Sequence, residues 1–199
     1  MDISQTQERF DIPCVILAGG KSSRMGSDKA LLPFGTFNSL AEFQYTKLGG
    51  FFKKVYISSK VNKFKFLHNQ ILDKEDLASA MIALKNILTF LQAEKVFIIA
   101  VDYPFVQKST IQTLINNTNE AEIILPKTEK THNLCGIYSL DTIKKIEFLL
   151  STNTHKISDL TTLCRTMMIQ FDETQEFSNL NFPQDYDFAH NLIKNNFYL

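Results

Sequence analysis

The sequence lacks several features that mark specialised classes of protein. Among 199 residues it has no tryptophan, five prolines and three cysteines. Cys14, Cys135 and Cys164 are odd in number and have no short spacing between them, which argues against a disulfide framework and against a zinc site. We therefore expect three reduced thiols.

The balance of charges and the shortness of the apolar runs exclude further classes of protein. The 21 basic side chains equal the 21 acidic ones, whereas nucleic-acid binding depends on an excess of lysine and arginine. The apolar runs 14–18 and 96–101 are far shorter than the roughly 20 residues of a membrane helix. Residues 1–12 lack the continuous apolar stretch of a signal peptide. We expect a cytoplasmic protein that binds neither nucleic acid nor membrane.

Apolar patterning predicts alternating strands and helices. The expected strands are 13–18, 54–58, 71–72, 96–101, 121–125, 134–139 and 167–171. The expected helices are 40–48, 76–91, 109–117 with Ser109 as its cap, 141–150, 157–163 and 184–194. The run 96–101 has no polar alternation, which is typical of a strand buried in a parallel sheet. We predict an α/β fold: a single three-layer α/β/α Rossmann-like domain, 1–199, with a mostly parallel sheet that binds ligands at the carboxyl ends of its strands.

A loop rich in glycine and basic residues follows the first predicted strand. Residues 17–33 read Leu-Ala-Gly-Gly-Lys-Ser-Ser-Arg-Met-Gly-Ser-Asp-Lys-Ala-Leu-Leu-Pro. Gly19 and Gly20 allow a sharp turn whose backbone N–H groups can approach a ligand, and nearby cations suit a polyphosphate. The spacing matches neither the P-loop nor the dinucleotide-binding pattern. Taken alone, glycines after a strand more often form only a simple turn.

Asp102 follows the apolar run 96–101 directly, and Pro104 prevents that strand from continuing. An isolated carboxylate at the carboxyl edge of the predicted sheet suits magnesium, which takes oxygen ligands from one or two carboxylates and from substrate phosphates. The alternative is a turn or a helix cap, which is a common role of aspartate near proline.

The segment 17–33 resembles the N-terminal signature of nucleotidyltransferases, and its Asp-Lys-Ala-Leu-Leu-Pro portion is similar to that of the molybdenum cofactor guanylyltransferases. The resemblance implies a fold of the nucleotide-diphospho-sugar transferase type. It also implies magnesium-dependent transfer of GMP from GTP to molybdopterin or the molybdenum cofactor, with release of pyrophosphate. Residues 13–105 would then bind the nucleotide and 106–199 the acceptor. Cofactor-delivery proteins and molybdoenzyme chaperones are the implied protein partners.

The same resemblance assigns roles to individual residues. Arg24 and Lys29 would neutralise phosphates, and together with Asp102, which would hold the magnesium ion, they form the implied catalytic group. The implied nucleotide contacts are Leu17, Ala18, Gly19, Gly20, Ser58 and Asp73.

Acceptor-side residues follow from three further segments. His132 belongs to a segment associated in the family with the pterin, and Lys156 would face the pterin phosphate. Asn179 and Asn181 match the family's Asn-x-Asn-x-Pro segment, in which an amide oxygen can contact magnesium or the pterin phosphate. The alternative for that segment is a turn that starts the last helix.

The resemblance leaves other activities open. The loop Glu75–Ser79 lacks the glycines and the proline that the family has beside the base. A nucleotidyltransferase that uses CTP or another nucleotide, with a pterin or sugar-phosphate acceptor, is therefore an alternative. A non-catalytic nucleotide-binding module is another. The lysine-rich stretch Lys53–Lys65 has no assigned role.

Overall fold

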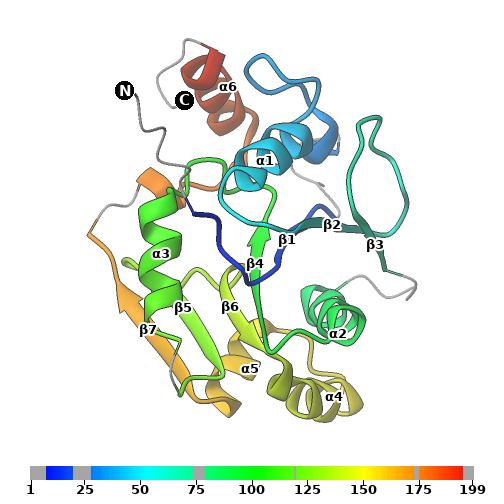
Figure 1. Cartoon of the computed structure of the whole chain (residues 1–199), viewed down its shortest axis with the longest axis vertical. Coiled ribbons are helices and arrows are strands. Elements are labelled where there is room, and N and C mark those ends of the chain that lie inside the picture. The colour runs from blue at the N-terminus through cyan, green and yellow to red at the C-terminus, as the bar shows by residue number, and fades with distance from the viewer. Residues whose placement is uncertain (1–7, 20–27, 74–78, 119, 173–174, 195–199) are drawn as a thin grey trace.

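A seven-stranded sheet forms the centre of the molecule (Figure 1). The structure, a computed structural model, describes residues 8–19, 28–73, 79–118, 120–172 and 175–194. The strand order is β3-β2-β1-β4-β6-β5-β7. The strands are β1 (Cys14–Leu17), β2 (Val55–Ser59), β3 (Gln70–Leu72), β4 (Lys95–Ala100), β5 (Ile123–Lys127), β6 (Cys135–Ser139) and β7 (Thr166–Gln170). Within this part of the chain β6 is antiparallel to both its neighbours, and the other pairs are parallel. The carboxyl ends of the six remaining strands therefore share one edge.

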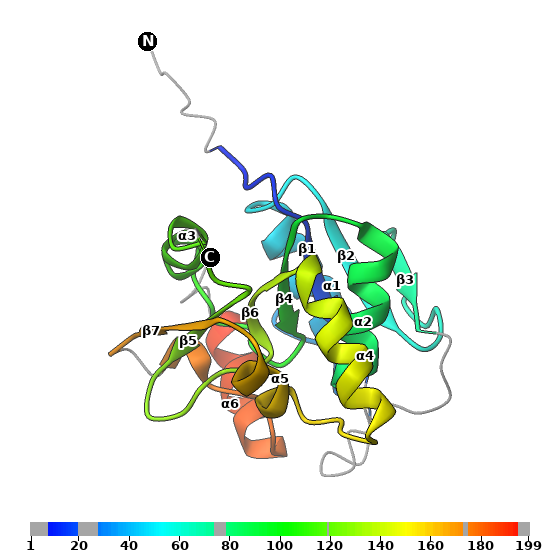
Figure 2. The same cartoon turned by 90° about the horizontal axis from the view of Figure 1, so that it is seen from below.

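Helices cover both faces of the sheet. One face carries α1 (Leu40–Gly49), α3 (Lys108–Asn116) and α6 (Pro183–Lys194). The other carries α2 (Ala80–Leu91), α4 (Ile143–Ser151) and α5 (Ile157–Leu163), and Figure 2 shows α2 and α4 side by side. Short 3-10 turns are η1 (Lys29–Leu31), η2 (Leu140–Thr142) and η3 (Gln175–Phe177). The predicted three-layer α/β/α arrangement with a mostly parallel sheet is confirmed.

No helix in the described ranges combines the length and the apolar character needed to cross a lipid bilayer. The three cysteines are buried and unpaired, as expected: Cys14 in β1, Cys135 in β6 and Cys164 after α5. Burial raises the pKa of the Cys164 thiol to about 11, which keeps it protonated at neutral pH.

The apolar pattern of the central strand decides its place in the sheet. Residues Val96–Ala100 of β4 are all buried, because β1 and β6 flank the strand and helices cover both of its faces. In α2, apolar residues at intervals of three and four meet the sheet, and Met81, Leu84 and Ile87 are buried. The apolar patterns of β4 and α2 thus agree with the buried positions of both elements.

Two predicted helix starts are wrong in detail. The helix predicted over 76–91 is not continuous at Ser79, which has extended backbone (φ −137°) and caps α2 by accepting a hydrogen bond from Ile82 N. Residues 76–78 lie outside the described residues. Ser109 does not cap α3, because the helix begins one residue earlier, at Lys108. The carboxylate of Glu176 accepts from Gln107 N at 3.1 Å instead, a tertiary cap that local sequence does not reveal.

Backbone hydrogen bonds align the ends of four parallel strands. Ala18 N donates to Ser58 O at 2.9 Å, and Val101 N donates to Leu17 O at 3.0 Å. Asp73 N donates to Ser59 O at 3.0 Å. The ends of β3, β2, β1 and β4 therefore lie in one row, as the sequence predicts.

Gly136 generates a stability prediction, because β6 leaves no room for a side chain there. A Cβ atom on Gly136 would lie 2.4 Å from the carbonyl oxygen of Ile124 and 2.6 Å from Leu125 Cδ2. We expect Gly136→Ala to lower the free energy of unfolding by about 1–3 kcal/mol, since a strand must shift. Urea denaturation with circular dichroism would measure the change.

The matched control is Gly49→Ala at the end of α1, where a Cβ atom meets nothing within 4 Å. Alanine favours a helix by up to roughly 1 kcal/mol over glycine, so we expect equal or slightly higher stability. Equal unfolding free energies for both variants would contradict the packing argument.

Candidate active site

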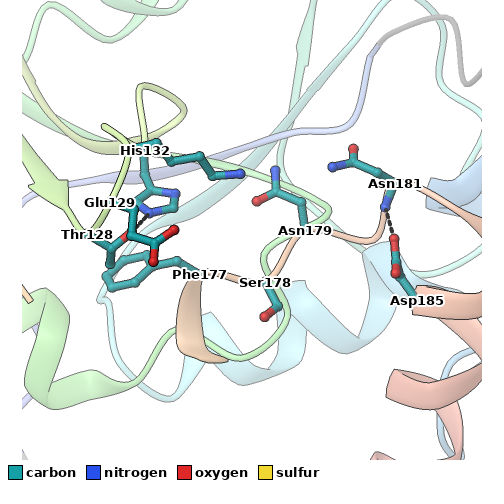
Figure 3. A pocket seen from close by; sticks show the side chains of 9 residues that line it. Thr128, Glu129, His132, Phe177, Ser178, Asn179, Asn181 and Asp185 are labelled. Carbon is teal, nitrogen blue, oxygen red and sulfur yellow. Dashed lines mark hydrogen bonds between the residues drawn. The ribbon is translucent and has the colours of Figure 1, made fainter. Parts of the chain in front are cut away.

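The carboxyl edge of the sheet carries a pocket of about 590 Å³ (Figure 3). Three segments build it: the loop after β5, the end of η3 with the connection that follows it, and the first turn of α6. Its lining consists of Thr128, Glu129, Lys130, His132, Phe177, Ser178, Asn179, Asn181 and Asp185. Figure 3 shows Asn179 in the middle of this view, with His132 on one side and Asn181 on the other. The volume falls within the range of small-molecule sites.

An ion pair joins the glycine-loop segment to the end of β4. Lys29 Nζ donates to Asp102 Oδ2 at 2.6 Å, and their side chains are only 19% and 13% exposed. Lys29 begins η1, whose preceding residue Asp28 accepts a hydrogen bond from Ala30 N at 3.1 Å. The structure thus brings together two predicted site residues that lie 73 positions apart.

The same ammonium group contacts the connection that leads to α6. Lys29 Nζ also donates to Leu180 O at 3.2 Å, and Leu180 N donates to Asp102 O at 3.2 Å. Asn179 and Asn181 flank this residue in the chain and line the pocket. The ion pair and the pocket are therefore parts of one site.

Two oxygens of this site have unused hydrogen-bonding capacity. Asp102 Oδ1 and Asn179 Oδ1 are both buried and have no hydrogen-bond partner. Leaving such an atom unpaired costs about 1–3 kcal/mol, so buried acceptors normally have a partner. Carboxylate and amide oxygens are ligands that Mg²⁺ accepts, and the donor set fits a hard cation. In the described ranges no group of three or more histidine, cysteine, aspartate or glutamate side chains could hold a metal ion.

His132 forms a buried wall of the pocket, with 2% of its surface exposed. Its Nε2 lies 2.9 Å from Thr128 Oγ1, its Nδ1 lies 3.4 Å from the Tyr103 hydroxyl, and its ring stacks on Phe177 at 4.6 Å. Burial, and secondarily the charge of Lys130, lowers the pKa of His132 to about 4. A neutral imidazole therefore holds the loop after β5 against η3, and its predicted role toward the pterin stays a prediction.

The predicted nucleotide residues lie along the row of strand ends. Leu17 ends β1 and Ala18 and Gly19 follow it, while Ser58 is buried near the end of β2. The carboxylate of Asp73 accepts a hydrogen bond from Asn86 Nδ2 of α2 at 2.6 Å. Gly20, a predicted nucleotide contact, and Arg24, predicted to neutralise phosphates, lie outside the described residues.

Lys156 lies apart from the other acceptor-side residues. It is exposed and precedes α5 directly, and its neighbour His155 lies 3.3 Å from Ser79 Oγ at the start of α2. It does not line the pocket of His132, Asn179 and Asn181. The structure therefore brings three of the four predicted acceptor residues together and not the fourth.

Several site residues carry no sequence signal of their own. Phe177 contacts His132 only because the fold joins the loop after β5 to η3, whereas Thr128 contacts it within that loop. Asn86 lies within a helix, with nothing local to link it to Asp73. Tyr103 had a weak signal, since it stands directly after Asp102 in the short segment that follows β4.

The depressed pKa of His132 predicts a pH-dependent stability. Because the folded value of about 4 lies below the ordinary 6.5, the unfolded chain binds the proton first as the pH falls. We expect the wild type to lose up to about 3 kcal/mol of stability from this group between pH 6.5 and 4. Urea denaturation across that range, compared with His132→Gln, would measure it. Identical pH slopes for the two proteins would contradict this account.

Comparison with known proteins identifies relatives of the whole chain. The model of the MobA-like NTP transferase domain matches residues 14–165. A molybdenum cofactor guanylyltransferase of Helicobacter pylori (strain G27) is 36% identical over 190 residues, which cover 92% of this chain and 94% of the relative. A molybdenum cofactor guanylyltransferase of Campylobacter jejuni subsp. doylei is also 36% identical, over 181 residues that cover 89% of this chain and 94% of the relative.

A solved structure supports the fold. Molybdopterin-guanine dinucleotide biosynthesis protein A from Archaeoglobus fulgidus superposes with a TM-score of 0.80 over 92% of this chain and 100% of its own, at 18% identity. The family match spans β1 through α5, and therefore includes Lys29, which begins η1, and Asp102, which follows β4. The chain belongs to the family of MobA-like NTP transferases.

Proposed function

We propose that this protein transfers GMP from GTP to molybdopterin, or to its molybdenum-bearing form, and releases pyrophosphate. The observation that carries the proposal is the Lys29–Asp102 pair at the carboxyl edge of the sheet, beside a buried Asp102 oxygen that has no partner. Relatives named molybdenum cofactor guanylyltransferase, matched over 94% of their length, support the choice of nucleotide and acceptor. The reaction takes place in the cytoplasm under this proposal.

The proposal divides the chain between two substrates. Residues 13–105 bind GTP, at the row formed by the ends of β1, β2, β3 and β4. Residues 106–199 bind the acceptor, which is supported by the pocket whose lining comes entirely from residues 128–185. Delivery proteins and molybdoenzyme chaperones are partners under the same proposal.

Magnesium belongs to this proposal because the donor set fits it. Asp102 Oδ1 and Asn179 Oδ1 are buried oxygens without partners, and substrate phosphates complete the coordination that Mg²⁺ prefers. When bound, the ion offsets negative charge on the phosphates. Lys29 Nζ, at 2.6 Å from Asp102, offsets the charge of that carboxylate in the ligand-free protein.

The chemistry needs no nucleophile from the protein. An oxygen of the acceptor phosphate attacks the α-phosphorus of GTP, a new P–O bond forms, and the bond to the β-phosphate oxygen breaks as pyrophosphate leaves. The protein must align these two anions and stabilise the charge that develops between them. Lys29 is suited to that task because its ammonium group reaches Leu180 O of the acceptor-side connection as well as Asp102.

Nucleotide selectivity is the first test. In the presence of Mg²⁺ we expect GTP to raise the melting temperature more than CTP, UTP or ATP, because a bound ligand stabilises by about 2.7 kcal/mol at 100 times its Kd. Differential scanning fluorimetry measures this. A larger shift with CTP would overturn the guanine assignment and favour a cytidylyltransferase. No shift with any of the four would overturn nucleotide binding.

Turnover of an Asp102 variant is the second test. We expect Asp102→Asn to reduce pyrophosphate release from GTP and molybdopterin by about 10²–10³, because the amide removes the charge that Lys29 and a cation share. The change is isosteric, so circular dichroism should match the wild type.

The control is Asp11→Asn, which breaks an exposed ion pair with Lys53 and should leave the rate unchanged. Full activity of Asp102→Asn would exclude Asp102 from the reaction. Wild-type protein that binds GTP and never releases pyrophosphate would favour the non-catalytic alternative.

A further inference from the structure

One lysine of the stretch Lys53–Lys65 reaches the candidate active site. Lys63 lies in the connection between β2 and β3, and its Nζ donates to Ala18 O at 2.9 Å. The same ammonium group forms an ion pair with Asp28. Only 17% of the Lys63 side chain is exposed, so both contacts are largely shielded from solvent.

The two acceptors of Lys63 bracket the glycine loop in the sequence. Ala18 follows β1 directly, and Asp28 directly precedes Lys29. Residues 19–27 lie between these two points in the chain. A single ammonium group therefore joins Ala18 to Asp28, which are ten positions apart in the chain.

Asp28 connects Lys63 to the segment that carries the Lys29–Asp102 ion pair. Its Oδ2 pairs with Lys63, while its Oδ1 accepts from Ala30 N at 3.1 Å and caps η1. The first residue of η1 is Lys29, whose Nζ lies 2.6 Å from Asp102. The contacts run from Lys63 through Asp28 and η1 to Lys29, without a gap.

The ion pair of Lys53 and Asp11, at the other end of β2, is an ordinary surface contact. Those side chains are 49% and 81% exposed, against 17% and 34% for Lys63 and Asp28. Exposed pairs of long side chains contribute little, because water competes for both charges. The Lys63 pair differs in its shielding, in its second acceptor and in its position at the phosphate loop.

We propose that Lys63 is a positioning residue for the nucleotide: it holds Ala18 and Asp28, and through the Asp28 cap of η1 it holds Lys29, in the arrangement that binds the phosphates of GTP. This inference rests on the proposed function. Lys63 contacts Ala18 and Asp28, whereas Lys29 contacts Asp102. The role of Lys63 is therefore to fix geometry, since preorganised groups lose less entropy when a ligand binds.

The test compares Lys63→Gln with the wild type and with Lys53→Gln as the matched control. Isothermal titration of GTP in Mg²⁺ should give an about tenfold higher Kd for Lys63→Gln, within the range of coupling energies between contacting residues, and an unchanged Kd for Lys53→Gln. In the turnover assay, KM for GTP should rise while KM for molybdopterin stays constant. A merely structural defect would lower the active fraction, and hence kcat, without raising KM for GTP.

Asp28→Asn supplies the independent variant should Lys63→Gln not fold. Asparagine can still cap η1, and it removes the charge that pairs with Lys63. If Lys63 acts through Asp28, the Kd of Asp28→Asn for GTP should rise several-fold. Removal of a negative charge near phosphates would by itself strengthen binding, so a lower Kd for Asp28→Asn would overturn the proposal.

Two outcomes separate this inference from the proposed function. A Lys63→Gln protein with the wild-type Kd and KM for GTP would overturn the role of Lys63 and leave the guanylyltransferase assignment intact. A wild type that binds GTP but forms no dinucleotide would overturn the proposed function, while the comparison of Kd values would still decide the role of Lys63.

Discussion

The parallel pairing of β1 with both β2 and β4 is the constraint on which the site depends. Leu17 pairs with Ser58 on one side and with Ala100 on the other, so three strands end at the same level. Asp102 then emerges next to the start of the glycine-loop segment. The strands stay in register because their side chains are buried on both faces, where a slip would expose apolar groups and break hydrogen bonds.

Electrostatic balance at this edge follows from that geometry. Asp102 is a poorly exposed carboxylate at the end of a buried strand, and desolvation of such a charge is costly unless a counter-charge compensates it. Lys29 supplies the counter-charge, and Lys63 and Asp28 form a second, adjacent pair. The two ion pairs thus join η1 and the residue before it to the end of β4 and to the β2–β3 connection, while Asp102 Oδ1 has no hydrogen-bond partner.

The reversed direction of β6 shapes the pocket. Because β6 runs against its neighbours, the loop between β5 and β6 returns at the carboxyl edge and brings His132 beside the segment after β4. Stacking on Phe177 then joins this loop to the chain that leads into α6. The pocket is therefore built by segments that are distant in sequence, and neutral His132 binds two of them together.

The sequence by itself determined the fold class, nearly all the helices and strands, and the strand ends that the predicted site residues follow. These are local properties: apolar periodicity sets burial, and the motif around Lys29 together with the carboxylate after β4 marks the edge. Tertiary structure alone decided which side chains meet. The Lys29–Asp102 pair, the cap of α3 by Glu176 and the bridge of Lys63 to Ala18 and Asp28 join residues dozens of positions apart. Periodicity carries no information on such contacts, because their geometry depends on how the layers pack and not on any short stretch of chain.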